Sequence, residues 1–359
     1  MDRSKGFATA VTPFPNFYGN TAAVQTLAQM IERGRISQAV VLSGPESVGK
    51  ATLARRFAAA LLGHAEKIEQ DDLSLAANAG IIEERENWTA EKRSDDPLLF
   101  STHPDFVTFA PDGPLRQISI QQMRMLRQKA QFKPLCGDHR VFLIDHLQRA
   151  NEQAANSLLK VLEEPPAHLV IIATAENAYD LLPTIRSRTM ILQMARLSDG
   201  EMMAFLTGKQ FADPELRMAI SDGCPGLAAR ADLEAFQARR SLMLAAFECA
   251  AGLVPFSAWI QQYEPFSTKK SEKLDLFIKP AYALLQDILA TSHGRPLPRN
   301  SDIKQRITQI AKATDFRWLE RAVSSIDELV LMVRRNIQKT AALDAMIIKL
   351  RNQPRRGGA

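Results

Sequence analysis

The chain has 359 residues, of which 46% are hydrophobic and 24% are charged. A chain of this length and composition forms two or three globular domains, which excludes a single small module, a collagen-like repeat and a disordered chain. Basic residues outnumber acidic ones by 45 to 40, and so small an excess does not by itself indicate a nucleic-acid-binding protein.

The expected cellular compartment follows from features that the sequence lacks. No run approaches the roughly 18–20 apolar residues of a membrane-spanning helix. The first residues contain no apolar segment of the kind found in secretory signals. The three cysteines lie far apart in the sequence and encode neither a disulfide framework nor a zinc-binding pair. We therefore expect a protein of the reducing cytoplasm.

Short apolar runs alternate with helical stretches through the first half of the chain. Runs without a polar face are typical of strands buried on both sides of a parallel sheet that helices cover. We expect one helix from Lys50 and another after Ser119, where Gln122 completes a capping box. We expect a third helix over Asn151–Leu162, which the two prolines at 165 and 166 stop. The expected strands are residues 39–42, 106–109, 141–144 and 169–173, and a fifth that begins at residue 190.

An acidic segment interrupts this alternation. Residues 65–102 hold ten acidic side chains against four basic ones, so the positive excess of the chain lies outside this segment. The segment shows no clear period, and we expect a loop or a loose helical excursion there.

Beyond about Ala195 the strand patterns end and helical patterns continue. The strongest is an amphipathic stripe near the end of the chain, which predicts a helix that packs against a partner bundle. Its apolar members are Leu319, Ala322, Ile326, Leu329, Val330, Val333 and Ile337.

The motif with the clearest chemistry lies between the first expected strand and the helix that follows it. In a G-x-x-x-x-G-K loop the backbone N–H groups surround a phosphate and the lysine reaches its terminal oxygens. Gly44, Gly49 and Lys50 hold these positions. The next residue should carry a hydroxyl group for Mg²⁺, but it is Ala51, and Thr52 comes one position late. We expect a degenerate nucleotide site, and whether it still binds a nucleotide stays open.

A second motif ends the expected strand 141–144. In nucleotide hydrolases an aspartate after such an apolar strand organises Mg²⁺, and Asp145 stands there; the alternative is that it only caps the strand. His146 follows, where hydrolysing members of this class carry a glutamate that polarises the attacking water. We therefore expect no ATP-driven step within this chain.

Four segments together resemble one protein family. They are HPDF (103–106), ISIQQMRMLRQKAQFKP (118–134), VFLIDHLQRANEQAANSLLKVLEEPP (141–166) and LLPTIRSRTM (181–190). Their order is similar to that in the delta-prime family of clamp-loader subunits of bacterial DNA polymerase III. The stretch NEQAANSLLKVLEEPP is especially specific.

The resemblance implies a fold and a division of the chain. Residues 1–195 would form an α/β AAA+ ATPase-like module of the P-loop type with a parallel sheet, and the acidic insert 65–102 would belong to it. Residues 196–245 would form a small helical lid. Residues 246–359 would form an all-α collar domain that serves oligomerisation.

The resemblance also implies a role. In that family the subunit is a rigid stator in a five-subunit ring with delta and ATPase subunits of the tau/gamma type. The ring loads a sliding clamp onto primed DNA during replication. The stator hydrolyses no ATP and requires no cofactor, so it belongs to the DNA polymerase holoenzyme without being an enzyme itself. A degenerate site for ATP or ADP remains possible in such a chain, made by Gly44, Gly49, Lys50, Thr52 and Asp145.

One residue carries the catalytic contribution that the resemblance implies. Ser187-Arg188-Thr189 resembles the Ser-Arg-Cys motif of the family, which presents an arginine finger to the ATP site of a neighbouring subunit. Arg188 is therefore the expected finger. Thr189 replaces the cysteine, which is not the group that contacts phosphate. Arg186, on the other side of Ser187, is a competing candidate.

Two further expectations concern metal and DNA. Many family members hold zinc with four cysteines after the P-loop helix, but residues 64–102 contain no cysteine. We expect no metal, and we expect His64, His103 and His139 to be structural or surface residues. A basic set could face DNA in the ring, or could equally be a solvated helix face: Arg116, Arg124, Arg127, Lys129, Lys133 and Arg140.

Two other functions stay open at this point. The first is the active ATPase motor subunit of the same ring, against which Ala51 and His146 argue. The second is a small-molecule kinase that uses the P-loop, which explains neither the Arg188 motif nor the helical final third. Steady-state ATPase activity of the purified chain separates an enzyme from a stator.

Overall fold

The computed structural model describes residues 14–267, 275–295, 300–333 and 339–351. No helix within these ranges is long and apolar enough to cross a membrane. The three-part division expected from the family stays a prediction. By its internal contacts the chain forms two compact units, Met1–Phe211 with Asp222–Leu227 and Ala212–Ser221 with Ala228–Ala359.

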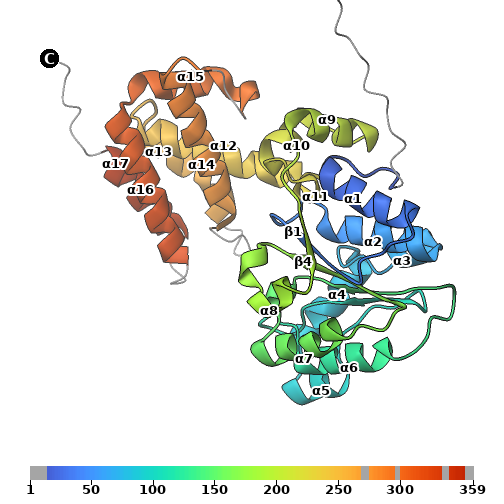
Figure 1. The fold of residues 1–359 in the computed structure, drawn as a ribbon. Coiled ribbons are helices and arrows are strands. Elements are labelled where there is room, and N and C mark those ends of the chain that lie inside the picture. The colour runs from blue at the N-terminus through green and yellow to red at the C-terminus, as the bar shows by residue number, and fades with distance from the viewer. Residues whose placement is uncertain (1–13, 268–274, 296–299, 334–338, 352–359) are drawn as a thin grey trace, which may run out of the picture. The chain divides into compact units, whose positions relative to one another are not determined.

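A five-stranded sheet is the centre of the first unit, with the order β2-β3-β4-β1-β5 (Figure 1). Every neighbouring pair is parallel, which confirms the sheet type expected from the unbroken apolar runs. The strands are β1 (Ala39–Ser43), β2 (Phe106–Phe109), β3 (Arg140–Ile144), β4 (Leu169–Ala175) and β5 (Met190–Gln193).

Helices cover both faces of this sheet because each strand alternates its side chains between two apolar cores. Val40 and Leu42 of β1 belong to one core, whereas Ala39 and Val41 belong to the other. The first core includes residues of α1 (Thr21–Glu32) and α2 (Lys50–Leu62). The second includes residues of α6 (Ile120–Ala130), α7 (Glu152–Glu163) and α8 (Pro183–Arg186).

The expected capping box at the start of α6 is confirmed. The Ser119 hydroxyl accepts from the Gln122 backbone N–H at 3.3 Å, and the Gln122 side chain accepts from the Ser119 N–H at 2.8 Å. The buried Gln122 amide also donates to the carbonyls of Leu98 and Ala110, at 2.9 and 2.7 Å. One side chain therefore starts the helix and ties it to the end of the acidic segment.

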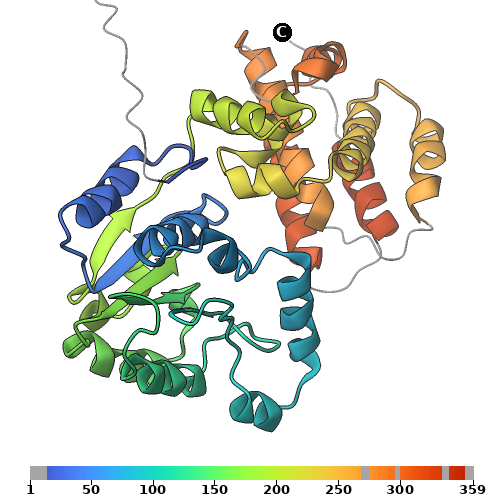
Figure 2. The same ribbon diagram turned by 90° about the vertical axis from the view of Figure 1, so that its right-hand side faces the viewer.

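The acidic segment 65–102 is a helical excursion, seen in Figure 2 as the teal helices. Asp71 joins the beginning of the segment to its end, because its carboxylate accepts from the backbone N–H and the hydroxyl of Thr102, at 3.0 and 2.7 Å. Phe100 forms an antiparallel bridge with Thr108, which covers the edge strand β2. Its helices are α3 (Ala65–Glu69), α4 (Ala76–Glu84), the 3₁₀ turn η1 (Arg85–Asn87) and α5 (Ala90–Asp95).

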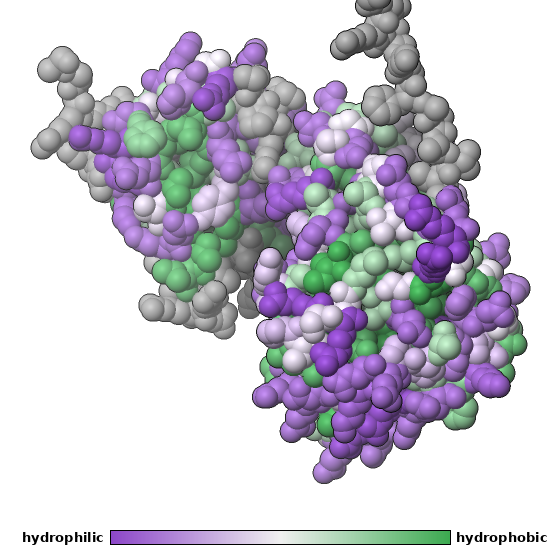
Figure 3. Space-filling model, in the orientation of Figure 1, coloured by the Kyte–Doolittle hydropathy of each residue, from purple (hydrophilic) through white to green (hydrophobic). Residues whose placement is uncertain are grey.

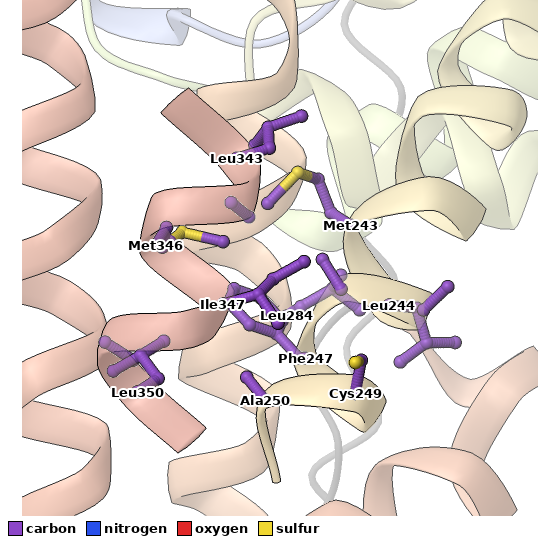
Figure 4. Close-up of a cluster of buried hydrophobic side chains, with 14 of the residues drawn as sticks. Met243, Leu244, Phe247, Cys249, Ala250, Leu284, Leu343, Met346, Ile347 and Leu350 are labelled. Carbon is purple, nitrogen blue, oxygen red and sulfur yellow. The ribbon is translucent and has the colours of Figure 1, made fainter. Parts of the chain in front are cut away.

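Helix α9 (Asp199–Gly208) follows the sheet in the first unit, α10 (Pro214–Ser221) belongs to the second unit, and α11 (Pro225–Arg230) has residues in both. The later helices of the second unit pack around one core, where Figure 4 shows α12, α14 and α17 side chains pointing toward one another. These later helices are α12 (Leu233–Ala250), α13 (Phe256–Ser267), α14 (Asp275–Ser292), α15 (Lys304–Ala313), α16 (Phe316–Val333) and α17 (Lys339–Arg351).

The apolar stripe of α16 packs within its own unit. Leu319, Ala322, Ile326 and Leu329 are buried in the core that includes residues of α12, α14 and α17. The expectation of a separate partner bundle for this stripe was therefore wrong for these four residues, because the neighbouring helices of the same chain cover them. The side chain of Val333 and the whole of Ile337 lie outside the described residues.

His103 is a buried neutral base in the first unit. Its side chain is 1% exposed, and its Nδ1 accepts from the Asp105 backbone N–H at 3.2 Å. The ring proton then belongs on Nε2, which has no hydrogen-bond partner among the described residues. Burial lowers the pKa of His103 below its ordinary value of 6.5, although Asp105 opposes the change.

This burial predicts a loss of stability on acidification. As the pH falls below about 6.5, the unfolded chain takes up a proton at His103 more readily than the folded chain does, so the free energy of unfolding falls with the pH. The slope from one proton is at most about 1.4 kcal/mol per pH unit. His103→Asn, whose side-chain oxygen can still accept from Asp105, should flatten the slope in urea unfolding. An unchanged slope would assign the acid sensitivity to other groups.

Candidate functional site

The loop between β1 and α2 has the backbone geometry that its two glycines permit. A Cβ at Gly44 would lie 2.1 Å from the carbonyl oxygen of Met194, so only glycine fits there. Gly49 caps α2 with φ of +100°, in the left-handed region that favours glycine. The structure therefore confirms that the motif forms a tight turn ending at a helix N-terminus.

The rest of the loop is held from two sides. Ser47 has φ of +61°, an uncommon value for a residue with a side chain. Its carbonyl accepts from the Gly226 N–H, at the start of α11, at 2.9 Å. The Phe17 ring lies against the other end of the loop, 3.3 Å from where a Cβ of Gly49 would be. Contacts from distant parts of the first unit thus support this strained turn.

Lys50 turns its ammonium group into its own loop. The side chain is buried, and Nζ donates to the carbonyls of Gly44 and Pro45 at 2.6 and 2.7 Å. Burial lowers the pKa of Lys50, while the negative charges of Asp145, Glu176 and Glu46 partly oppose that change. Two of its three ammonium donors are used by the fold.

Asp145 lies beside this loop, at the end of β3. It is 8% exposed, and its Oδ1 accepts from the Thr174 hydroxyl at 2.5 Å. The same hydroxyl accepts from the His146 N–H at 2.8 Å. Thr174 therefore joins the two residues that follow β3 to the end of β4.

His146 stands between two carboxylates. Its Nε2 is 3.8 Å from Asp145 Oδ2 and its Nδ1 is 3.7 Å from Glu176 Oε1. Its backbone φ is +55°, so this residue, like Ser47, has a strained conformation at the site. Sequence reasoning missed Thr174 and Glu176. The signal that could have found them is their place at the end of β4, because β4 lies between β3 and β1.

Thr52 does not stand in the position of the missing hydroxyl. It lies on α2 one residue after Ala51, and successive residues of a helix point about 100° apart around its axis. The structure thus brings Gly44, Gly49, Lys50 and Asp145 to one edge of the sheet. Among the described residues, no group of three or more His, Cys, Asp or Glu side chains is placed to hold a metal ion. The expectation that the chain binds no zinc stays a prediction.

Arg188 lies at the opposite edge of the sheet, where the parallel strands have their amino ends. β1 and β5 pair with Val40 beside Met190 and Ser43 beside Gln193. The P-loop follows Ser43, whereas Arg188 precedes Met190. β1 has five residues, and at about 3.3 Å per residue the two edges are roughly 16 Å apart. Arg188 therefore lies far from the nucleotide-type site of its own chain.

The guanidinium of Arg188 is exposed but held in place. Its Nη2 is 3.1 Å from Glu163 Oε1 at the end of α7, and its Nη1 donates to the Thr184 carbonyl at 3.1 Å and the Ser187 hydroxyl at 3.3 Å. The competing Arg186 lies over the ring of Tyr179, 5.0 Å from its centroid. The two arginines thus have different surroundings.

The predicted basic set is only partly a surface feature. Hydrophilic side chains cover the end of the first unit where α5, α6 and α7 lie (Figure 3). Arg140, however, is buried and donates to the carbonyls of Lys129, Phe132 and Pro104. Neither of the two interpretations left open for this set, a DNA-facing surface or a solvated helix face, holds for Arg140, because these carbonyls and Asp105 bind its guanidinium inside the fold. Arg116 forms an ion pair with Glu86 at 2.5 Å.

A family described as "DNA polymerase III, delta subunit" matches residues 19–198, which is half of the chain. The chain belongs to this delta-subunit family. The match contains the P-loop, Asp145 and Arg188, so the predicted resemblance to clamp-loader subunits is confirmed.

Individual relatives of this chain include both delta-prime and gamma/tau subunits of DNA polymerase III. DNA polymerase III subunit delta' of Escherichia coli is 27% identical over 214 residues, 58% of this chain and 62% of that protein. The delta' subunit of Pseudomonas aeruginosa is 31% identical, over 45% of this chain and 44% of its own length. The gamma/tau subunit of Mycobacterium tuberculosis is 29% identical, over 54% of this chain and 30% of its own length. Each match spans less than two thirds of the relative.

Two solved structures resemble this delta-subunit family member over most of its length. A gamma subunit-related protein of Thermotoga maritima has a TM-score of 0.47 at 17% identity, covering 91% of this chain and 98% of that one. The clamp-loader delta protein of Bacillus subtilis has a TM-score of 0.36 at 10% identity, covering 92% and 99%.

The Thr174 hydroxyl gives a direct test of the site's geometry. Thr174→Val keeps the shape of the side chain but leaves Asp145 Oδ1 and the His146 N–H without this partner, so it should lower the free energy of unfolding by about 1–3 kcal/mol. Thr108→Val on β2 is the matched control, because that hydroxyl is equally buried and has no partner among the described residues. Equal midpoints for the two variants in urea unfolding would contradict the hydrogen-bond assignment.

Proposed function

We propose that this chain is the delta-prime stator of a DNA polymerase III clamp loader. In this role it works in the cytoplasm in a five-subunit ring with delta and ATPase subunits of the tau/gamma type. The ring loads the sliding clamp onto primed DNA. The chain hydrolyses no ATP itself and supplies Arg188 to the ATP site of a neighbour. Membership of the delta-subunit family and the delta-prime relatives support this role.

One observation carries the proposal: the P-loop follows the carboxyl end of β1, whereas Arg188 precedes the amino end of β5, so the two lie at opposite ends of the parallel strands. An arginine finger has to reach the transferring phosphoryl group to stabilise its charge. Arg188 is too far from the loop of its own chain to do so, yet its guanidinium is at the surface. A second subunit docked at this edge would bring a nucleotide to it.

The loop edge supports a stator that does not turn over ATP. Lys50 donates to its own loop, Ala51 offers no hydroxyl to Mg²⁺, and His146 stands where a catalytic glutamate would polarise water. We infer that the chain needs no cofactor and no zinc. A nucleotide held at Gly44, Gly49, Lys50, Thr52 and Asp145 would be a structural one.

The alternative is an active motor subunit of the same loader. The gamma/tau relatives favour it, because they are as similar in identity as the delta-prime ones. The stator role predicts no ATP turnover by the purified chain, whereas the motor role predicts turnover.

The stator role predicts that the isolated chain shows no Mg²⁺-dependent ATPase activity. Working phosphoryl-transfer enzymes reach about 1 s⁻¹ or more, so a steady-state phosphate-release assay has ample range. A purified gamma-type subunit assayed in parallel is the positive control. Turnover on the scale of that control would establish the motor role and refute the stator.

A further prediction of this role concerns Arg188 in a reconstituted loader. Arg188→Ala should slow ATP hydrolysis at the neighbouring site by up to about 10³–10⁵-fold while the other sites continue. Total ATPase activity would then fall in part, and clamp loading would fall further. Arg188→Lys should rescue poorly, because an ammonium group cannot present the planar guanidinium fork.

Arg186→Ala is the matched control, since it removes a guanidinium two residues away. A larger loss from Arg186→Ala than from Arg188→Ala would mean that Arg186 is the finger. Wild-type rates in both variants would remove the trans-acting role from this chain.

A further inference from the structure

The contacts of Arg188 define a holder for its guanidinium. Three acceptors from two elements surround the group: Glu163 Oε1 from the end of α7, and the Thr184 carbonyl and Ser187 hydroxyl from the turn at α8. An arginine has five N–H donors, so at least two remain for a phosphate. These three contacts therefore fix the orientation of the guanidinium and leave N–H donors available for a phosphate.

Glu163 has little reason to be in this position for the stability of the fold. Its side chain is 53% exposed and that of Arg188 is 37% exposed, and exposed ion pairs contribute only about 0–1 kcal/mol. A carboxylate in the last turn of a helix is also disfavoured by the helix dipole. Pro165 sets this location, because a residue before proline avoids the helical conformation and Glu164 has left it, with φ of −134° and ψ of 68°.

The pair does restrict a long side chain at a point where direction matters. An arginine at the surface samples many rotamers, and ordering one such side chain on binding costs about a factor of two to ten in an equilibrium or a rate. Because Glu163 already orders the Arg188 side chain in the folded chain, this entropy cost does not arise again when a partner binds. The contact links α7 to the turn after α8, so the guanidinium keeps its place relative to the sheet edge.

We propose that Glu163 is a positioning residue for Arg188, which orients the guanidinium toward the phosphates of a neighbouring subunit; this rests on the proposed function of Arg188. Glu163 itself does not touch the nucleotide. It acts by keeping one side of the guanidinium engaged while the other side faces the partner.

The test uses a reconstituted loader in which only the site next to this chain can hydrolyse ATP. Glu163→Ala should lower kcat at that site about two- to tenfold with an unchanged KM for ATP. Glu163→Gln, which keeps a side-chain oxygen as acceptor, should lose less. Glu164→Ala is the matched control, because it removes the same charge from the neighbouring exposed residue and should leave kcat as in the wild type.

A double variant separates positioning from a general structural effect. In an Arg188→Ala background, Glu163→Ala should cause no further loss. An additional loss there, a rise in kcat with Glu163→Ala, or equal losses from Glu163→Ala and Glu164→Ala would each overturn the positioning role. If Arg188→Ala itself leaves hydrolysis unchanged, the proposed function fails; if Arg188→Ala slows hydrolysis and Glu163→Ala does not, only the positioning role fails.

Discussion

The polarity of the parallel sheet is the constraint on which the rest of this structure depends. All five strands point the same way, so every segment that follows a strand leaves at one edge and every segment that precedes a strand arrives at the other. The P-loop and Asp145 follow strands, and Arg188 precedes one. A chain with this topology has two chemically different edges, and it offers an arginine at one and a phosphate-type loop at the other.

At the loop edge, buried charges are paired within the fold. An uncompensated ammonium or carboxylate in this position would be costly, and the structure offsets that cost by giving Lys50 two loop carbonyls and Asp145 the Thr174 hydroxyl. In a working P-loop site the lysine and aspartate would serve phosphate and Mg²⁺. In this structure their contacts stabilise the turn.

Some residues that depart from local preference stand at these two edges, while others with positive φ, such as His64 and Arg116, lie elsewhere in the first unit. Ser47 and His146 have positive φ values, and both belong to the loop edge. Glu163 places a negative charge at the unfavourable end of α7, and it belongs to the arginine edge. Departures of this kind persist where the surrounding structure holds them and where they have a use.

Much of the fold and of the site could be predicted from the sequence. Strands without a polar face indicate a parallel sheet, and Ser119 with Gln122 indicates the start of α6, because these signals depend only on neighbouring residues. The glycines of the P-loop are also local, since their backbone angles exclude other residues. The acidic segment gave no period, and its helices depend on tertiary ties such as Asp71 to Thr102.

Only the tertiary structure decided which side chains meet. Thr174 reaches Asp145 because β4 lies between β3 and β1, and nothing in the local sequence marks that threonine. Arg140 looked like a surface base, but it is buried and donates to the carbonyls of Lys129, Phe132 and the more distant Pro104. Glu163 and Arg188 are 25 residues apart in the sequence, and their contact arises where α7 ends beside the turn after α8. By itself the sequence determined the elements and the motif chemistry; strand order and helix packing determined the partners, because they depend on the whole chain.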